Sequence, residues 1–327
     1  MPKRRFAQAV PCVIAGLVTS GTATVYYAQP SIAYPPNCLV VDYDQCALEA
    51  AKAPLSLCAE LADLVGPVLS LAINLPSHVP LEQTRDDLRA ASCLLDASGR
   101  LTLLMPSRSG HSAVGRMLEE CFESVRRCTG KTISFDCAGP KRIGTQVPNR
   151  IVTYQDPVSD SELELWTRPG IFSAEHVDPG SALLLEAIGQ PSGKTLVDVG
   201  CGYGVLGIVA AKRGAKVTMV DCDVRAVKLA RENLQRNALQ GQVLLANTLV
   251  GLANGSTDMA ISNPPTHAGS GQIIDILREM ARVCHEGSQL LIVVREHLQY
   301  ESWLACLGNV QRLLQRDGYK VLGVNYT

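Results

Sequence analysis

Residues 195–239 constrain the fold of this chain more than any other segment. An apolar strand over residues 195–199 leads into a glycine-rich loop, a helix over residues 205–212 and a second strand over residues 217–220. Asp223 follows that strand and is placed to cap the next helix. Strands and helices that alternate in this way build parallel sheets. The segment therefore predicts an α/β fold.

The glycine loop is compatible with two kinds of cofactor. The spacing of Gly202, Gly204 and Gly207 is that of dinucleotide-binding loops, which present backbone N–H groups to a pyrophosphate. Asp198 stands two residues before Gly200, where its carboxylate would repel a pyrophosphate. The same carboxylate suits a cofactor with an ammonium and a sulfonium group. The loop therefore predicts S-adenosylmethionine, with a nicotinamide dinucleotide as the alternative.

Further cofactor contacts are expected where the next strands end. Asp221 ends the second strand, where a carboxylate can accept hydrogen bonds from both ribose hydroxyls, although a helix cap is an alternative role. Asn247 ends the third strand, where an amide can contact adenine or serve as a turn residue. The predicted cofactor site comprises Asp198, Gly200, Cys201, Gly202, Gly204, Asp221, Cys222, Asn247, Thr248 and Asn263.

Three more strands and a hairpin complete the predicted sheet. Residues 242–248, 258–262 and 288–298 read as the third, fourth and fifth strands. The chain then closes with a hairpin on Asp317-Gly318. This pattern predicts a doubly wound sheet, in which ligands bind beyond the carboxyl ends of the strands.

The fourth strand runs directly into Asn263-Pro264-Pro265. Such residues are ordinary in turns, but here they follow a strand next to the cofactor loop. An exocyclic amine on an aromatic base is a poor nucleophile, because its lone pair is delocalised into the ring. The side-chain oxygen of Asn263 and the carbonyl of Pro264 can accept its two hydrogens, and the prolines hold both acceptors rigid. The predicted catalytic residues are Asn263, Pro264, Pro265 and Thr266.

These motifs resemble those of a known family. The stretches "DVGCGYGVLG", "SNPPTHAG", "VVREHLQYESWL" and "RPGIFSAEHVDPGSALLLEA" are similar to the bacterial ribosomal RNA guanine-N2 methyltransferases, the small-subunit type first and the large-subunit relatives next. The resemblance covers residues 165–327 well and the first half weakly. It implies methyl transfer from S-adenosylmethionine to a guanine of ribosomal RNA, in a cytoplasmic protein that needs neither a metal nor a membrane.

The resemblance also implies which residues surround the base. Residues 172–181 match a family segment that lines the cofactor and base pocket, and residues 295–300 match one that supports the active site. The implied substrate-binding residues are Phe172, His267, Arg295 and His297. The family commonly has an aromatic residue after Asn-Pro-Pro that stacks on the base, whereas this chain has Thr266. That departure puts the identity of the substrate in doubt more than the methyl transfer.

The first half of the chain reads as a faded copy of the second. Residues 38–52, 70–80 and 99–108 repeat the pattern of residues 217–231, 258–268 and 288–296, in the same order. No glycine loop precedes Asp42, and Asn74-Leu75-Pro76 has lost one proline. We therefore expect two methyltransferase-like domains in tandem. A degenerate, substrate-assisting domain would span residues 1–145 and a catalytic domain residues 146–327, with a linker within residues 139–160.

Composition excludes some classes of protein. The net charge is -1, so any affinity for RNA must come from local groups, for which the candidates are Lys3, Arg4, Arg5, Arg126, Arg127, Lys131, Lys141 and Arg142. The 12 cysteines form no C-x-x-C pair and no zinc-like cluster, and contexts such as "AASCLL" and "LACLG" favour buried reduced thiols. The basic, partly apolar N-terminus is interrupted by Pro11 and Gly16, which disfavours a signal peptide.

Two other functions remain open from the sequence. The same Asn-Pro-Pro chemistry serves methyltransferases of a protein glutamine or of a small-molecule amine, and the near-neutral charge and Thr266 favour that alternative. A methyltransferase-like interaction module without activity is the other, and the presence of Asp198, Asp221 and Asn263 disfavours it. The modified nucleotide, the oligomeric state and the choice between free RNA and an assembled small ribosomal subunit do not follow from the sequence.

Overall fold

The chain divides into two compact units, Met1–Pro148 and Asn149–Thr327. The structure is a computed structural model, and it describes residues 23–28, 34, 38–51, 55–64, 66–77, 79–106, 110–129, 133–144, 149–265 and 270–326. The boundary predicted between residues 145 and 146 lies three residues before this division.

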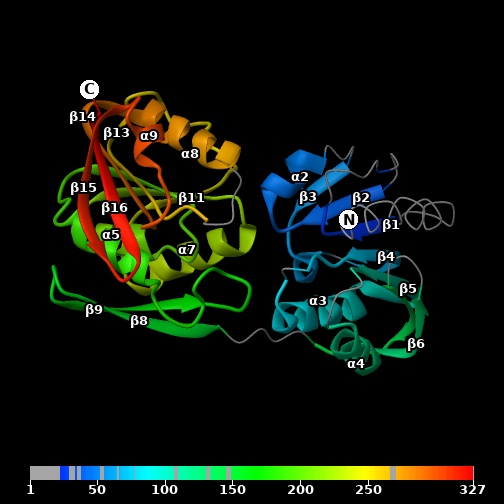
Figure 1. Cartoon of the computed structure of the whole chain (residues 1–327). Coiled ribbons are helices and arrows are strands. Elements are labelled where there is room, and N and C mark those ends of the chain that lie inside the picture. The colour runs from blue at the N-terminus through cyan, green and yellow to red at the C-terminus, as the bar shows by residue number, and fades with distance from the viewer. Residues whose placement is uncertain are drawn as a thin grey trace. The chain divides into compact units, whose positions relative to one another are not determined.

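The second unit contains a seven-stranded sheet in the order β12-β11-β10-β13-β14-β16-β15 (Figure 1). Its strands are β10 (Thr195–Val199), β11 (Lys216–Asp221), β12 (Gln242–Leu245), β13 (Thr257–Ser262), β14 (Cys284–Arg295), β15 (Gly308–Arg316) and β16 (Tyr319–Tyr326). The first five are parallel, and β16 pairs antiparallel with both β14 and β15. The predicted doubly wound sheet with a closing antiparallel hairpin is confirmed.

Helices cover this sheet on both faces. They are α5 (Pro179–Ile188), α6 (Val205–Lys212), α7 (Val224–Arg236), α8 (Ser270–Val283) and α9 (Glu301–Leu304). Alternate side chains of each strand join different apolar cores, since successive residues of a strand point to opposite faces. Leu196 and Met219 share a core with α5, α6 and α7, whereas Val197 and Val220 share one with α8 and α9.

Most predicted elements lie within one or two residues of their observed bounds, but two differ. The third strand ends at Leu245, so Asn247 and Thr248 lie in the loop that follows it. The fifth strand begins earlier and ends at Arg295. The closing hairpin turns on Asp317 (φ 54°) and Gly318 (φ 77°), as predicted, because two positive φ values match the twist of paired strands.

A two-stranded hairpin that the sequence analysis missed begins the second unit. Strands β8 (Arg150–Asp156) and β9 (Ser161–Thr167) pair antiparallel within a segment that includes part of the predicted linker. The predicted linker was too long, because residues 139–140 belong to strand β7 (Ile133–Pro140) and residues 150–156 form β8. Three prolines in this stretch concealed the alternating pattern "RIVTYQD".

The hairpin is held to the sheet layer by a buried ion pair. Arg213 donates to both carboxylate oxygens of Asp156, at 3.0 and 2.5 Å, and to the carbonyls of Leu185 and Gly189. Burial acts to raise the pKa of Asp156, but the hydrogen bonds from Arg213 and Ser159 outweigh it and hold the pKa well below its ordinary value. The guanidinium therefore joins β8 to the end of α5.

The first unit repeats the topology of the second. Its sheet has the order β3-β2-β1-β4-β5-β7-β6, which matches the order of the second sheet strand for strand. The strands are β1 (Ala23–Tyr26), β2 (Cys38–Asp42), β3 (Leu55–Cys58), β4 (Val68–Asn74), β5 (Leu95–Met105), β6 (Phe122–Thr129) and β7, and the helices are α2 (Gln45–Ala51), α3 (Leu81–Leu94), α4 (His111–Cys121) and the 3-10 turn η1 (Leu61–Asp63). The predicted duplication is confirmed.

Cysteine burial departs from its prediction at two positions. Nine cysteines of the described ranges are free, and among them Cys93 and Cys306 are exposed. These are the cysteines of "AASCLL" and "LACLG", which were expected to be buried. Cys93 lies on an outer position of α3 and Cys306 lies in the turn after α9, where the neighbouring apolar residues face the core and the thiol does not. Within the described ranges, none of the helices has the length and apolar character needed to cross a bilayer.

Candidate active site

Three neighbouring strands of the second unit end at one edge of the sheet. Val199 of β10 lies opposite Ser262 of β13, and the Ser262 hydroxyl donates to the Val199 carbonyl at 2.7 Å. The next residues, Gly200 and Asn263, therefore leave the sheet together. Strand β11, which ends in Asp221, pairs with the other side of β10. This edge is the switch point of the doubly wound sheet, where ligands bind.

The glycine loop combines open backbone with tight packing. Gly200, Gly202 and Gly204 have φ values of 72°, 57° and 94°, which L side chains rarely adopt. A Cβ on Gly200 or Gly202 would meet nothing within 4 Å, so this backbone is open to a ligand. A Cβ on Gly204 or Gly207 would instead collide with the core, the latter with Met219 at 2.5 Å. The first two glycines therefore suit cofactor approach, and the last two permit α6 to pack on the sheet.

Asp198 lies beneath this loop and is fully buried. One carboxylate oxygen accepts from the backbone N–H of Gly207 at 3.0 Å, and the other has no partner among the described residues. Burial raises the pKa of Asp198 to about 7, the Gly207 N–H opposes the shift and Asp221 adds to it. A buried carboxyl of this kind gains from a nearby positive charge.

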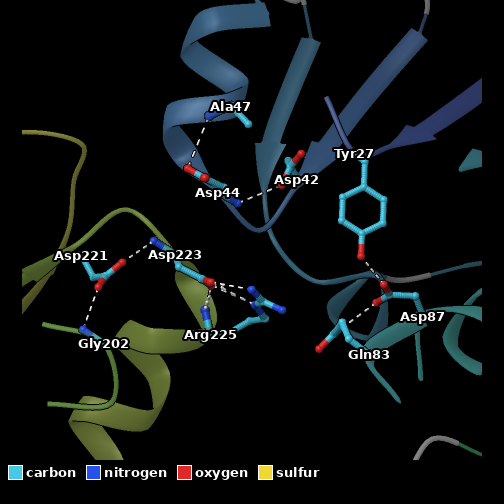
Figure 2. A network of polar contacts seen from close by, with 10 residues as sticks. All are labelled: Tyr27, Asp42, Asp44, Ala47, Gln83, Asp87, Gly202, Asp221, Asp223 and Arg225. Atoms are coloured by element: carbon cyan, nitrogen blue, oxygen red, sulfur yellow. Dashed lines mark hydrogen bonds and ion pairs between the residues drawn. The ribbon is translucent and has the colours of Figure 1, made fainter. Parts of the chain in front are cut away.

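Asp221 holds the loop in place. One of its carboxylate oxygens accepts from the Gly202 N–H at 2.8 Å, and the other accepts from the Asp223 N–H at 2.9 Å (Figure 2). Each carboxylate oxygen can accept more than one hydrogen bond, so both retain capacity for ligand hydroxyls. Asp223 caps α7 through the N–H of Arg225, as predicted.

The first unit preserves the carboxylate contacts without the glycines. Asp42 accepts from the N–H of Ala28 at 2.7 Å, and from the N–H of Asp44 at 3.0 Å (Figure 2). Asp221 likewise accepts from a loop N–H and from the N–H two residues after it. Tyr27 donates its N–H to Val41 and has φ 66°, as Gly200 donates to Val220 with φ 72°. A tyrosine therefore stands at the position of the first loop glycine.

The Tyr27 side chain packs in the interior of the first unit. Its ring is buried and packs against Tyr26, with 4.4 Å between the ring centroids, and against Tyr43. Its hydroxyl donates to Asp87 of α3 (Figure 2). Burial, followed by the charge of Asp87, raises the pKa of Tyr27 well above its ordinary value. A bulky side chain therefore stands where the second unit has its first loop glycine, and the sequence has no glycine between Gly21 and Gly66.

Asn263 is oriented by residues at the start of α5. Its side-chain nitrogen donates to a carboxylate oxygen of Asp178 at 3.0 Å and to the hydroxyl of Ser181 at 2.9 Å. None of the described residues donates to its side-chain oxygen. The amide oxygen is therefore the atom that remains for a ligand.

Asp178 is itself held by several groups. It caps α5 by accepting from the Ser181 N–H at 2.9 Å, and its other oxygen accepts from the Tyr319 hydroxyl at 3.1 Å. Gly180 permits this approach, because a Cβ there would lie 2.7 Å from the Tyr319 ring. The Arg295 guanidinium stacks over the Tyr319 ring, 4.1 Å from the ring centroid.

The remaining predicted site residues have varied environments. Cys201 is buried, Cys222 and Thr248 are half-buried, and Asn247 is exposed. Pro264 is buried beside Asn263 and Pro265 is exposed, whereas Phe172, Arg295 and His297 are all exposed. Thr266 and His267 lie outside the described residues. Across the described ranges, His, Cys, Asp and Glu side chains nowhere gather in a group of three that could hold a metal ion.

The sequence analysis included Asp178 and Ser181 only as part of the segment 172–181, which the resemblance implies at the pocket, and it did not identify Tyr319. The signal was the segment Asp178-Pro179-Gly180-Ser181, in which Asp and Pro alone already satisfy a helix start. The glycine directly after them is unexpected in a helix and indicates a close neighbour. That neighbour is Tyr319, which also bonds Asp178 across 141 residues of sequence.

Comparisons with known proteins agree with this geometry. The methyltransferase small domain family matches residues 162–323. A ribosomal RNA small subunit methyltransferase C of Pseudomonas entomophila is 30% identical over 238 residues, which cover 69% of this chain and 70% of that protein. The protein of the same name from Haemophilus influenzae (strain PittGG) is 34% identical, with 62% of each chain covered.

A solved structure shares the fold of the whole chain. The T. thermophilus 16S rRNA N2 methyltransferase, determined in complex with AdoMet and guanosine, superposes with a TM-score of 0.80 and 22% identity, and covers 96% of this chain and 92% of its own. Two sheets of one topology, an open glycine loop and the relatives named above agree with the resemblance seen in the motifs. The chain belongs to the ribosomal RNA small subunit methyltransferase C family.

Proposed function

We propose that this chain is an S-adenosylmethionine-dependent methyltransferase that modifies the exocyclic N2 amine of a guanine in ribosomal RNA. The observation that carries the proposal is the orientation of Asn263, whose amide oxygen is left available next to the open glycine loop. The names of the relatives and the ligands of the T. thermophilus structure support the same activity.

The residues of the site fit the cofactor and the chemistry. Gly200 and Gly202 offer open backbone, and Asp198 offers a buried carboxyl with an unpartnered oxygen. S-adenosylmethionine, when bound, supplies an electrophilic methyl group. The Asn263 oxygen and the Pro264 carbonyl accept the two amine hydrogens and direct the nitrogen lone pair, and the rigid prolines keep both acceptors in place. No general base is needed, because the methylated amine loses its proton readily.

The direct test is nucleoside mass spectrometry. Ribosomal RNA incubated with the protein and S-adenosylmethionine should gain N2-methylguanosine at one position. Assembled small subunits and naked RNA should be compared in parallel, since we propose the subunit or its RNA as the partner. Methylation of a protein glutamine or of a small amine, with none on RNA, would contradict the proposal.

Asp221 is predicted to govern cofactor affinity. Asp221→Ala removes the acceptors for ribose hydroxyls and the bonds to Gly202 and Asp223, so affinity should fall by about tenfold or more, because hydrogen bonds to charged groups contribute about 1.5–3 kcal/mol. Calorimetry on the full chain should find one site in the wild type. Asp42→Ala removes matching bonds from the first unit and should leave the affinity unchanged. A second cofactor site in the wild type, or an unchanged cofactor affinity in Asp221→Ala, would contradict the assignment of the cofactor site to the second unit and Asp221.

Cofactor affinity is also predicted to depend on pH through Asp198. Its pKa is raised to about 7 by burial, so the free protein is mostly protonated there below pH 7. A positively charged ligand favours the ionised form, so affinity should rise with pH through 7 and then level off, by up to about tenfold between pH 6 and 8. The same measurements on Asp198→Asn show how much of the pH dependence comes from the cofactor's own ionisable groups. An equal change of affinity with pH in wild type and Asp198→Asn would contradict the prediction.

Phe172 is proposed as the aromatic that contacts the base. Its side chain is 62% exposed in the segment before α5, and position 266, where the family places an aromatic, holds threonine. Phe172→Ala should raise KM for RNA by about 5- to 150-fold with kcat nearly unchanged, since base stacking contributes about 1–3 kcal/mol. Val158→Ala, at another exposed apolar residue, is the matched control. An unchanged KM for RNA would remove Phe172 from the site.

The first unit is proposed to assist substrate binding. Tyr27 stands in place of the first loop glycine, and the first unit retains the strand order of the second. Among the predicted RNA contacts, Arg127 and Arg142 are exposed, Arg126 pairs with Asp136 at 3.0 Å and Lys141 donates to the Glu119 carbonyl. Lys3, Arg4, Arg5 and Lys131 lie outside the described residues. A ribosomal RNA substrate supports the cytoplasmic location expected from the sequence.

A further inference from the structure

The segment Asp178-Pro179-Gly180-Ser181 opens helix α5 and contacts the proposed catalytic residue. We propose that Asp178 is a positioning residue, which holds the Asn263 carboxamide with its oxygen directed toward the substrate amine. The inference rests on the function proposed above and adds a residue to it. Asp178 reaches the substrate only through Asn263, with which it shares a hydrogen bond of 3.0 Å.

The groups that face the Asn263 amide nitrogen can accept hydrogen bonds from it. A carboxamide can rotate by 180° and exchange its oxygen and nitrogen, and the methyl transfer needs the oxygen on the substrate side. A carboxylate has only acceptor atoms, so Asp178 can face the amide nitrogen and repels the amide oxygen. The Ser181 hydroxyl accepts from the same nitrogen at 2.9 Å. That hydroxyl can also donate, so the Ser181 contact is compatible with either orientation, and the Asp178 carboxylate selects the one observed.

Hydrogen bonds to other groups prevent the Asp178 side chain from turning away from Asn263. The oxygen that accepts from Asn263 also accepts from the Ser181 N–H at 2.9 Å, and the other oxygen accepts from Tyr319 at 3.1 Å. Asp178 is only 8% exposed, so water does not readily replace these hydrogen-bond partners. The Ser181 N–H and the Tyr319 hydroxyl, both independent of Asn263, therefore hold the buried carboxylate as a rigid reference for the amide.

Asp178 has two roles that substitutions can separate: it caps helix α5 and it orients Asn263. Aspartate, asparagine and serine are about equally good N-cap residues. Among them, only aspartate and asparagine have an acceptor oxygen far enough along the side chain to meet Asn263. Asparagine can keep its oxygen on Asn263 and the Ser181 N–H, and turn its nitrogen to the Tyr319 hydroxyl, which can accept. Serine ends one bond earlier and caps the helix only.

The experiment compares Asp178→Ser with Asp178→Asn in the full chain. Asp178→Ser should lower kcat for methyl transfer to ribosomal RNA by about 10- to 100-fold, with KM for RNA and cofactor affinity nearly unchanged, because the amide loses its fixed orientation. Asp178→Asn should retain kcat within several-fold. Thermal unfolding of the two variants should be similar, because both keep a helix cap. Equal kcat in the two variants would overturn the proposal.

A double variant tests the route through Asn263. If Asp178 acts only by orienting that amide, Asp178→Ser should change the residual kcat of Asn263→Ala by less than about twofold, because the two effects are then not additive. If the two substitutions instead lower kcat by factors that multiply in the double variant, Asp178 acts by another route and the proposal is overturned.

An NMR readout is independent of activity. With asparagine side chains labelled with ¹⁵N, the Asn263 amide protons should be protected from exchange in the wild type and in Asp178→Asn, and lose protection in Asp178→Ser. Inactive wild-type protein with this pattern would defeat the proposed function and leave the orientation intact. Active wild-type protein with full kcat and unchanged protection in Asp178→Ser would defeat the inference alone.

Discussion

Replacing Asn263 with alanine is expected to lower the rate of methyl transfer by about 10²–10³, with cofactor affinity nearly unchanged. The amide oxygen is the acceptor next to the open loop, and removal of one pre-organised polar group of this kind costs about 10²–10³ in rate in other enzymes. The cofactor is instead held by groups at the ends of β10 and β11, so its binding should survive.

Single-turnover transfer to ribosomal RNA measures this effect separately from product release. Calorimetry with the same variant checks the cofactor, and a loss there comparable to the loss in rate would show that the substitution disrupts the loop. Asn309→Ala removes an exposed asparagine from the edge strand β15 and is the matched control. Full activity in Asn263→Ala would falsify the mechanism.

Replacing Arg213 with alanine is expected to destabilise the second unit by about 3–5 kcal/mol. Both side chains of the Arg213–Asp156 pair are 0% exposed, so the variant leaves a buried carboxylate and two carbonyls without their donor. Arg278→Ala removes one member of an ion pair whose side chains are 75% and 69% exposed, and should cost about 0–1 kcal/mol.

Tryptophan fluorescence during urea unfolding is the measurement. The chain has two tryptophans, Trp166 and Trp303, and both belong to the second unit, so the signal reports on that unit alone. Trp166 lies in β9 of the hairpin that Arg213 holds. Equal urea midpoints for the wild type and Arg213→Ala would show that the Arg213–Asp156 pair contributes nothing to the stability of the second unit.

The pH dependence of the Arg213 effect has a definite sign. The pKa of Asp156 is lower in the folded protein than in the unfolded chain, so the pair stabilises the fold above the unfolded pKa of about 4. The stabilisation is lost as pH falls below that value. The difference between wild type and Arg213→Ala should therefore be constant from pH 6 to 8 and shrink below pH 4.

Local patterns were sufficient for the sheet and the cofactor loop. The strand, loop, helix and strand of residues 195–221 were predicted to within a residue, because period-two apolar runs, glycines at positive φ and a capping Asp223 act between near neighbours. The faded first copy was also visible, since Asp42 follows its strand as Asp221 does. The hairpin β8–β9 escaped because prolines around it suggested a linker.

The contents of the site depended on longer contacts. Sequence alone placed Asn263 after a strand, but its orientation depends on Asp178, 85 residues earlier, and Asp178 depends on Tyr319, 141 residues later. Exposure of Cys93 and Cys306 likewise followed from which side of each element meets the core.

The sequence by itself determined the fold class and the duplicated layout, because these follow from periodicity and from residues adjacent along the chain, and the same signals predicted the candidate site residues. Only the tertiary structure decided which way the Asn263 amide points, that the Tyr27 side chain packs in the interior of the first unit, and that Arg213 and Asp156 meet in the interior of the second. The physical reason is that a hydrogen bond or an ion pair depends on distances of about 3 Å between side chains. Such distances are set by how sheets and helices pack, and no local pattern specifies them.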